Sequence, residues 1–267
     1  MSVNYDYVVD TARRLTGSTA NPRLLDFGCG GAQILAKALP AGFDAWGVDR
    51  FAPDWNELLA KPSPEVMNRV LTLDDNGKLP FPDHHFDVVV ANMVFEHIDD
   101  FAGPLSEIRR VLEPGGNFLT IFPTWELWHE NHVGLPFAHR FAKESRFRHR
   151  YMVAAHKLGF GRSREQLKTD AWVKNMEQVL DDMTFYKRFY EVRRSVQNAG
   201  FEIAESLEAN HLSYRVRRQL RSVALARLIE RPLVRPLFNY VGSRLLFRVL
   251  HLRPVTSSGT QKLPEGI

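Results

Sequence analysis

Short apolar runs alternate with helical patterns through the first half of this chain. Between the runs, stretches such as 30–40 and 101–116 carry apolar residues at helical spacing, and another helix is predicted to start at DWNELLA (54–60). The Val-rich run inside 86–98 is continuously apolar, which is typical of a strand covered on both faces. This alternation predicts a parallel sheet with helices on both sides. The predicted strands are 23–28, 44–50, 69–75, the Val-rich part of 86–98, and 117–123.

The alternation stops after residue 124. An aromatic- and Arg-rich segment follows, and its helical spacing predicts a cap over the sheet. The sheet is expected to resume with a strand at 200–209, followed by basic helices at 211–240 and a last, antiparallel strand at 243–253. The predicted units are a core at 1–124, a helical cap at 125–199, the remainder of the sheet with a basic helical insertion at 200–255, and a loose polar tail at 256–267.

The composition is that of a globular protein. The chain has 267 residues, 44% hydrophobic and 25% charged, which is enough apolar material for a sizeable core. Its single cysteine excludes an internal disulfide and favours a reducing compartment. The sequence shows no secretory signal and no apolar run approaching ~18 residues. We therefore expect a cytoplasmic protein.

The two halves of the chain carry opposite charge. Residues 1–124 contain 10 Lys and Arg against 17 Asp and Glu, whereas residues 125–267 contain 25 against 14. A basic half predicts an acidic partner, a membrane surface, or only a solvated face. The stretch YRVRRQLRSVALARLIERPLVR (214–235) fits a basic amphipathic helix that contacts a membrane peripherally, or a helix packed on the sheet. Nucleic acid is disfavoured because no binding module is recognisable.

A glycine-rich turn, LLDFGCGGAQ (24–33), follows the first predicted strand. Alone it fits either a tight turn or a loop that cradles a ligand. Asp49 lies at the end of the next predicted strand, about twenty residues further on, where a carboxylate can bind a ribose diol. The pair favours a nucleoside-containing ligand but leaves NAD, FAD and S-adenosylmethionine open.

Further motifs narrow this choice. LPFPDHHFDVVV (79–90) leads into the Val-rich strand, a Glu-His pair follows it at 96–97, and LEPGG (112–116) precedes the fifth strand. Together with LLDFGCGGA and GVD, these motifs resemble the class I S-adenosylmethionine-dependent methyltransferases over about residues 20–124. The resemblance implies an α/β, Rossmann-like, doubly wound, mostly parallel seven-stranded sheet with a helical cap. It also implies S-adenosylmethionine as the cofactor.

The resemblance assigns roles to individual residues. Asp26 is expected to orient the methionine amino group, and Asp49 to bind the ribose hydroxyls. The glycine loop passes under the cofactor, with Ala32 in place of the usual third glycine, and Cys29 is expected to be packed there without acting as a nucleophile. The expected cofactor-binding residues are Asp26, Gly28, Cys29, Gly30, Asp49, Arg50, Asp75, Asn76 and Asn92.

The acceptor side is expected after the fifth strand, where TWELWHENHVGLPFAHRF (124–141) contains His129 and His132. A hydroxyl acceptor must lose a proton, and a histidine suits this role near neutral pH. His129, His132 and His97 are the candidate catalytic bases. Metal ligation through the two histidines and Glu130, or plain loop histidines, remain alternatives, and we expect no bound metal.

The sequence therefore predicts methyl transfer from S-adenosylmethionine by in-line displacement to an oxygen of a small-molecule, sugar, quinone-like or lipid-linked acceptor. Two alternatives remain. A nicotinamide-dependent oxidoreductase would share the glycine turn but would not explain LPFPDHHFDVVV or LEPGG. A non-catalytic cofactor-binding protein would use its cap as an interaction module.

Overall fold

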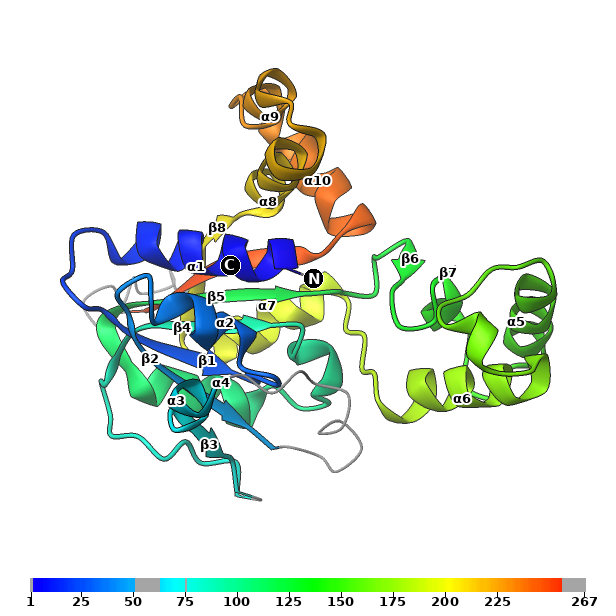
Figure 1. Cartoon of the computed structure of the whole chain (residues 1–267), viewed down its shortest axis with the longest axis horizontal. Coiled ribbons are helices and arrows are strands. Elements are labelled where there is room, and N and C mark those ends of the chain that lie inside the picture. Colours follow the sequence, from blue (N-terminus) through cyan, green and yellow to red (C-terminus); the bar gives the residue numbers. More distant parts are fainter. Residues whose placement is uncertain (1, 51–62, 75, 256–267) are drawn as a thin grey trace, which may run out of the picture.

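The computed structural model describes residues 2–50, 63–74 and 76–255. Within these residues, the main sheet has seven strands in the order β3-β2-β1-β4-β5-β9-β8 (Figure 1). Strand β9 runs antiparallel to both of its neighbours, and the other pairs are parallel. The strands are β1 Arg23–Phe27, β2 Asp44–Asp49, β3 Val70–Thr72, β4 Phe86–Asn92, β5 Leu112–Phe122, β8 Phe201–Ser206 and β9 Arg248–Pro254. The predicted fold class is confirmed.

Helices cover both faces of this sheet and build two projections beside it (Figure 1). The α-helices are α1 Ser2–Thr16, α2 Gln33–Ala38, α3 Pro64–Met67, α4 Ala102–Val111, α5 Arg146–Lys157, α6 Thr169–Asp182, α7 Phe189–Asn198, α8 Glu208–Arg215, α9 Val223–Ile229 and α10 Arg235–Leu245. Short 3-10 turns lie at Phe95–His97, Ala138–Arg140 and Arg164–Gln166, and a π-helical turn spans Val216–Leu220. Among the described residues, no helix combines the length and apolarity needed to cross a membrane.

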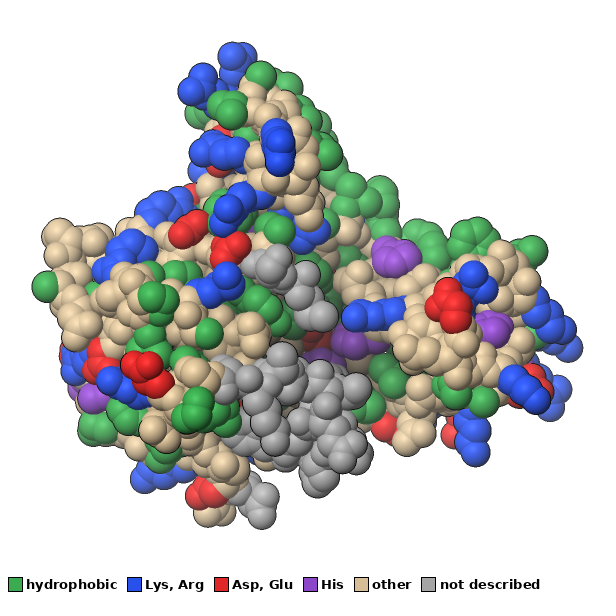
Figure 2. All heavy atoms as spheres, viewed as in Figure 1, with side chains coloured by type: hydrophobic (Ala, Val, Ile, Leu, Met, Phe, Trp, Pro, Cys, Tyr) green, Lys and Arg blue, Asp and Glu red, His purple; other side chains and the backbone are tan. Residues whose placement is uncertain are grey.

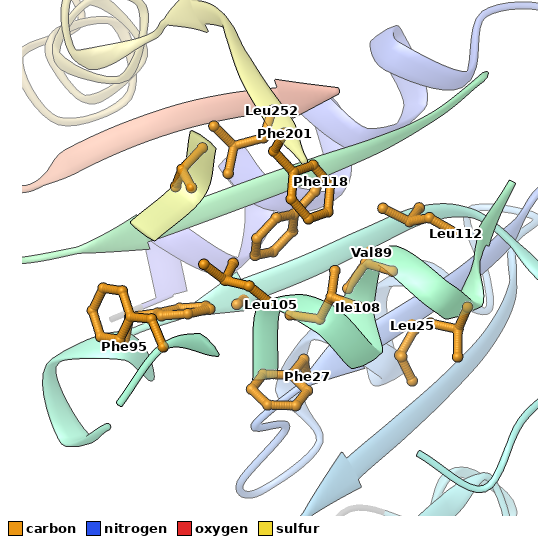
Figure 3. Packing of buried hydrophobic residues seen from close by; sticks show 14 of the residues in the cluster. Leu25, Phe27, Val89, Phe95, Leu105, Ile108, Leu112, Phe118, Phe201 and Leu252 are labelled. Atoms are coloured by element: carbon orange, nitrogen blue, oxygen red, sulfur yellow. The ribbon is translucent and has the colours of Figure 1, made fainter. Parts of the chain in front are cut away.

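Strand β4 forms the centre of the core, because both of its faces are buried. Val89 belongs to the cluster that includes α4 and α7, whereas Val88 and Val90 belong to the cluster that includes α1 and α2. Figure 3 shows the first cluster, in which Phe95, Leu105 and Phe118 lie close together. The alternating burial explains the continuous Val-rich run, which has no polar face.

The cap has its own small core. Strands β6 His129–Glu130 and β7 Leu135–Pro136 pair as a hairpin, and helices α5 and α6 pack beside it around the fully buried Trp172. Helix α7 returns to the sheet, where Val192 and Val196 join the main core. The part of 125–199 after α6 therefore contributes to the sheet layer, and the predicted domain boundaries stay predictions.

Two predicted element boundaries differ from the structure. The helix predicted at 101–116 ends at Val111, because Leu112 is already extended and pairs with Phe86 in the sheet. The Pro-Gly-Gly segment lies in a register shift of that pairing. The last strand begins at Arg248, because residues up to Leu245 continue α10. The helix predicted to start at 54–60 lies outside the described residues.

Candidate active site

The glycine loop between β1 and α2 is held between the ends of two neighbouring strands. The N–H groups of Gly28 and Cys29 both donate to the Val48 carbonyl on β2, at 2.9 and 3.0 Å. Gly28 has φ +74°, and a Cβ at this position would lie 2.4 Å from Cγ2 of Val94, which follows β4. Both the backbone conformation and the close approach therefore require glycine.

Two carboxylates lie at the carboxyl ends of β1 and β2, beside this loop. Asp26 is 1% exposed, and neither carboxylate oxygen accepts a hydrogen bond from a described residue. Burial, together with the charge of Asp49, raises the Asp26 pKa well above its ordinary value. Asp49 Oδ2 accepts a hydrogen bond from the Gly30 N–H at 2.7 Å. An unpartnered buried carboxylate is costly unless a ligand satisfies it, and the ammonium of a methionine moiety would do so.

The other predicted cofactor residues lie around the same edge. Cys29 is buried, and burial is the main cause that raises the pKa of its thiol. Asn92 ends β4, and its buried Oδ1 has no hydrogen-bond partner among the described residues. Arg50 and Asn76 are exposed, and Asp75 lies outside the described residues. The structure thus brings the loop, Asp26, Asp49 and Asn92 together, and their cofactor roles stay predictions.

Ala32 occupies the position of the missing third glycine. It has φ +52° and ψ 30°, which is left-handed backbone that favours glycine. Its side chain is fully buried in the cluster beneath α2, and its N–H donates to the Cys29 carbonyl at 2.8 Å. The backbone shape of a glycine is therefore retained, and the added methyl group is packed.

A 3-10 turn after β4 places Glu96 and His97 beyond the sheet. Glu96 is 1% exposed, neither of its carboxylate oxygens has a hydrogen-bond partner among the described residues, and burial raises its pKa to about 8. His97 Nδ1 donates to the Met183 carbonyl at 2.6 Å, so the neutral ring keeps its lone pair on Nε2. Burial lowers the pKa of His97, which favours this neutral form.

The cap hairpin places a second histidine beside this turn. His132 Nδ1 lies 2.8 Å from Glu130 Oε1, which also accepts a hydrogen bond from the Tyr186 hydroxyl at 2.5 Å. The Val133 N–H donates to the other Glu130 oxygen at 2.5 Å. Burial alone would raise the pKa of Glu130. Hydrogen bonds from His132, Tyr186 and Val133, together with the charge that His132 carries when protonated, outweigh burial and lower the pKa to about 2. Glu130 is therefore ionised and holds the Nδ1–H of His132.

The two histidines come together at this place. Their ring centroids lie 5.3 Å apart with the rings nearly perpendicular. One ligand atom from each of Glu96, His97 and His132 lies within 4.8 Å of the others, so these residues could either pass a proton or hold a metal ion. Figure 2 shows histidine and acidic side chains in the recess between the sheet and the cap.

Not every predicted residue joins this cluster. His129 is exposed on β6, whereas its neighbour Glu130 is fully buried. The sequence suggests Glu130 only as a metal ligand, and the Glu-x-His spacing is the signal for its pairing with His132. Tyr186 lies 56 residues from Glu130 in the chain, so no local pattern announced its hydrogen bond.

Comparison with known proteins decides the family. Residues 5–206 match the family described as "Methyltransferase domain". The chain belongs to this methyltransferase family. This match confirms the prediction of a class I S-adenosylmethionine-dependent methyltransferase. It disfavours the alternative of a nicotinamide-dependent oxidoreductase.

Curated relatives of this methyltransferase match only part of it. A demethylmenaquinone methyltransferase of Staphylococcus saprophyticus is 33% identical over 97 residues, covering 35% of this chain and 41% of the relative. A 2-methyl-6-phytyl-1,4-hydroquinone methyltransferase of Synechocystis is 32% identical over 117 residues, covering 43% of this chain and 35% of the relative. An uncharacterized methyltransferase of Schizosaccharomyces pombe is 28% identical, and 37% of its length is covered. The chain therefore spans less than half the length of these relatives.

A solved structure matches the methyltransferase over most of its length. The S-adenosylmethionine-dependent methyltransferase from Mesorhizobium loti superposes with a TM-score of 0.52 and 15% sequence identity. The match covers 93% of this chain and 99% of that protein. The likeness extends beyond the sheet and establishes the fold.

Proposed function

We propose that this methyltransferase transfers a methyl group from S-adenosylmethionine to a hydroxyl oxygen of a small-molecule acceptor, with His132 as the base. The observation that carries the proposal is the Glu130–His132 pair, which lies against His97 at the turn after β4. The same turn is joined through Val94 to the glycine loop beneath the predicted cofactor site. The proposal thus places a proton acceptor beside a methyl donor.

The cofactor site suits S-adenosylmethionine, which supplies a methyl group on a positively charged sulfur when bound. The buried Asp26 carboxylate would pair with the cofactor's amino group, and Asp49 would bind the ribose. Gly28 lets the backbone pass close beneath the cofactor. The role of these residues is to orient the methyl group toward the acceptor and to exclude water.

Proton removal is the second requirement, because an alkylated hydroxyl becomes acidic as the new bond forms. With Nδ1–H directed at Glu130, neutral His132 has its lone pair on Nε2 and can take the proton there. The ionised Glu130 would stabilise the resulting imidazolium, as a carboxylate does for the histidine of a catalytic triad. Tyr186 and the Val133 N–H position Glu130.

The acceptor is proposed to be a phenol- or quinol-type hydroxyl on a small or lipid-linked molecule. Two relatives are named for a demethylmenaquinone and for a phytyl-substituted hydroquinone, which supports a quinol-type molecule as the acceptor. The choice of its hydroxyl oxygen rests on the proposed base. Sugars, which also carry hydroxyl groups, belong among the candidate acceptors to be tested.

The test is an acceptor screen that measures release of S-adenosylhomocysteine. With a turned-over acceptor, His132→Ala should lower kcat by about 100-fold or more while binding of S-adenosylhomocysteine is unchanged. His149→Ala, an exposed histidine on α5, is the control and should keep full activity. Full activity in His132→Ala would remove the proposed base. Loss of activity on chelation, restored by a divalent ion, would instead assign the Glu96, His97 and His132 cluster to a metal.

A further inference from the structure

A helical projection with exposed apolar side chains stands out from the sheet. We call residues 216–245 the arginine–leucine projection; it comprises the π-helical turn, α9 and α10 (Figure 1). Among the described residues, it holds eight of the seventeen large apolar side chains that are exposed, and Leu233 is 96% exposed. The eight are Leu220, Val223, Leu225, Leu228, Leu233, Leu237, Tyr240 and Leu245. Such a concentration exceeds the scatter of single apolar residues that is normal on a protein surface.

These exposed apolar side chains are additional to the buried core of the projection. Ala209, Val216, Ala226 and Ile229 already form a buried cluster between α8 and α9. On α10, Leu237 and Tyr240 are three residues apart and share one helical face, and Leu233 lies in the turn just before this helix. The projection thus has a packed interior and a separate apolar exterior.

The projection is also strongly basic. Residues 216–245 contain seven arginines and one acidic residue, Glu230. Arg218 pairs with Asp6 and Arg235 with Glu205. Four other arginines are exposed, and none of them pairs with a carboxylate of the described chain: Arg217, Arg221, Arg227 and Arg231.

The apolar exterior extends onto the cap. The Trp128 N–H donates to the Arg244 carbonyl at 2.8 Å, and the Phe137 N–H donates to the Trp128 carbonyl at 2.8 Å. Trp128 and Phe137 are 43% and 41% exposed, so they lie beside the end of α10 with their side chains accessible. Figure 2 shows hydrophobic side chains along the flank of the projection toward the cap, with Lys and Arg at its tip and opposite flank.

We propose that the arginine–leucine projection docks this protein onto an anionic phospholipid surface. Leucines, a tyrosine and a tryptophan beside unpaired arginines suit the boundary between acyl chains and headgroups, where apolar side chains enter and guanidinium groups bind phosphates. The unpaired positive charge selects an anionic surface over a neutral one. The inference stands on this surface alone and does not depend on the proposed acceptor or base.

Co-sedimentation of the full chain with vesicles tests the proposal. Binding is expected to phosphatidylcholine vesicles that contain phosphatidylglycerol, and it should weaken with salt and nearly vanish on pure phosphatidylcholine. Arg227→Gln with Arg231→Gln should lower the partition coefficient about 25-fold, at roughly fivefold per arginine. Leu233→Ser with Leu237→Ser should lower it at least about tenfold.

Helix α5 offers matched controls with the same chemistry. Arg146→Gln with Arg150→Gln removes two exposed arginines, and Phe147→Ser with Leu158→Ser removes two apolar side chains that are each 75% exposed. Both controls should bind vesicles like the unaltered protein. S-adenosylhomocysteine binding and circular dichroism show that each variant is folded.

Four outcomes would overturn the proposal. Equal binding to neutral and anionic vesicles, or an equal loss in the α5 controls, would remove the specific role of the arginines. Absence of vesicle binding by the unaltered chain would exclude membrane docking altogether. A concentration-dependent doubling of mass in light scattering that Leu233→Ser abolishes, without vesicle binding, would assign the surface to a second copy of the chain.

Discussion

Gly28 shows how one position can serve the backbone and the ligand together. Its positive φ and its contact with Val94 each exclude a side chain. We predict that Gly28→Ala abolishes binding of S-adenosylhomocysteine by isothermal titration calorimetry, because Val94 and the loop must move apart. Gly17→Ala is the control, since Gly17 also has positive φ, +57°, but nothing lies within 4 Å of its added Cβ. Retained binding in Gly28→Ala would show that the loop does not approach the cofactor.

Glu96 gives the site a pH-dependent stability. Burial raises its pKa from 4.5 to about 8, so the folded protein keeps a proton that the unfolded chain has lost in this range. Stability from this group is therefore full below pH 4.5 and falls as pH rises toward 8, by up to ~1.4 kcal/mol per unit.

Glu96→Gln removes this titration. In thermal melts, the variant should gain stability relative to the unaltered protein as pH rises from 4.5 to 8. Glu65→Gln, on the short helix α3, gives a control at an exposed carboxylate. Parallel melting curves for Glu96→Gln and the unaltered chain across this range would contradict the raised pKa.

At the scale of elements, the strands of the sheet and a helical cap were predictable, but the arrangement inside the cap was not. Strands β1, β2 and β4 are mostly apolar runs that end at Asp49 or Asn92 or directly before Gly28, and this signal is local. The two strands of the hairpin β6–β7 have only two residues each, which is too short for a periodic pattern. The Glu130–Tyr186 hydrogen bond joins side chains 56 residues apart in the chain, which periodicity does not reveal. The same limit explains why His129 and His132 looked equivalent in sequence, although only His132 reaches the Glu96–His97 turn.

The cap contains a buried ion pair that joins its two helices. Arg148 on α5 is 2% exposed and donates to both carboxylate oxygens of Asp181 on α6. We predict that Arg148→Ala costs roughly 3–5 kcal/mol of cap stability, because it leaves Asp181 without its partner. Hydrogen exchange in α5 and α6 would measure the loss, with the amides of β4 as an internal control.

A double variant distinguishes the loss of the ion pair from the cost of leaving one buried charge unpaired. Replacing Arg148 by Met and Asp181 by Leu should recover most of the stability, because no unpaired charge remains. If Arg148→Ala and the double variant lose the same free energy of unfolding, packing of the aliphatic part of Arg148, and not the ion pair, stabilises the cap.

At the scale of the whole molecule, the sheet and the arginine–leucine projection differ in the number of buried apolar side chains that stabilise them. The sheet has two large clusters, whereas the buried cluster between α8 and α9 consists of four residues. We predict that amides of α9 and α10 exchange faster than those of β4 and β5 in hydrogen exchange measured by mass spectrometry. Equal protection in all four elements would contradict this order of stability.

The strand order of the far edge has a consequence for the chain's architecture. Strands β8 and β9 are antiparallel neighbours, and the Leu207 N–H donates to the Val249 carbonyl at 2.8 Å just beyond the last strand residue. The chain therefore leaves the sheet for α8 and returns to it within one strand spacing, about 4.8 Å. Everything from 208 to 247 is topologically the loop of a hairpin. A short turn joining Leu207 to Arg248 would leave every strand pairing in register, so the last two strands do not need this segment in order to pair.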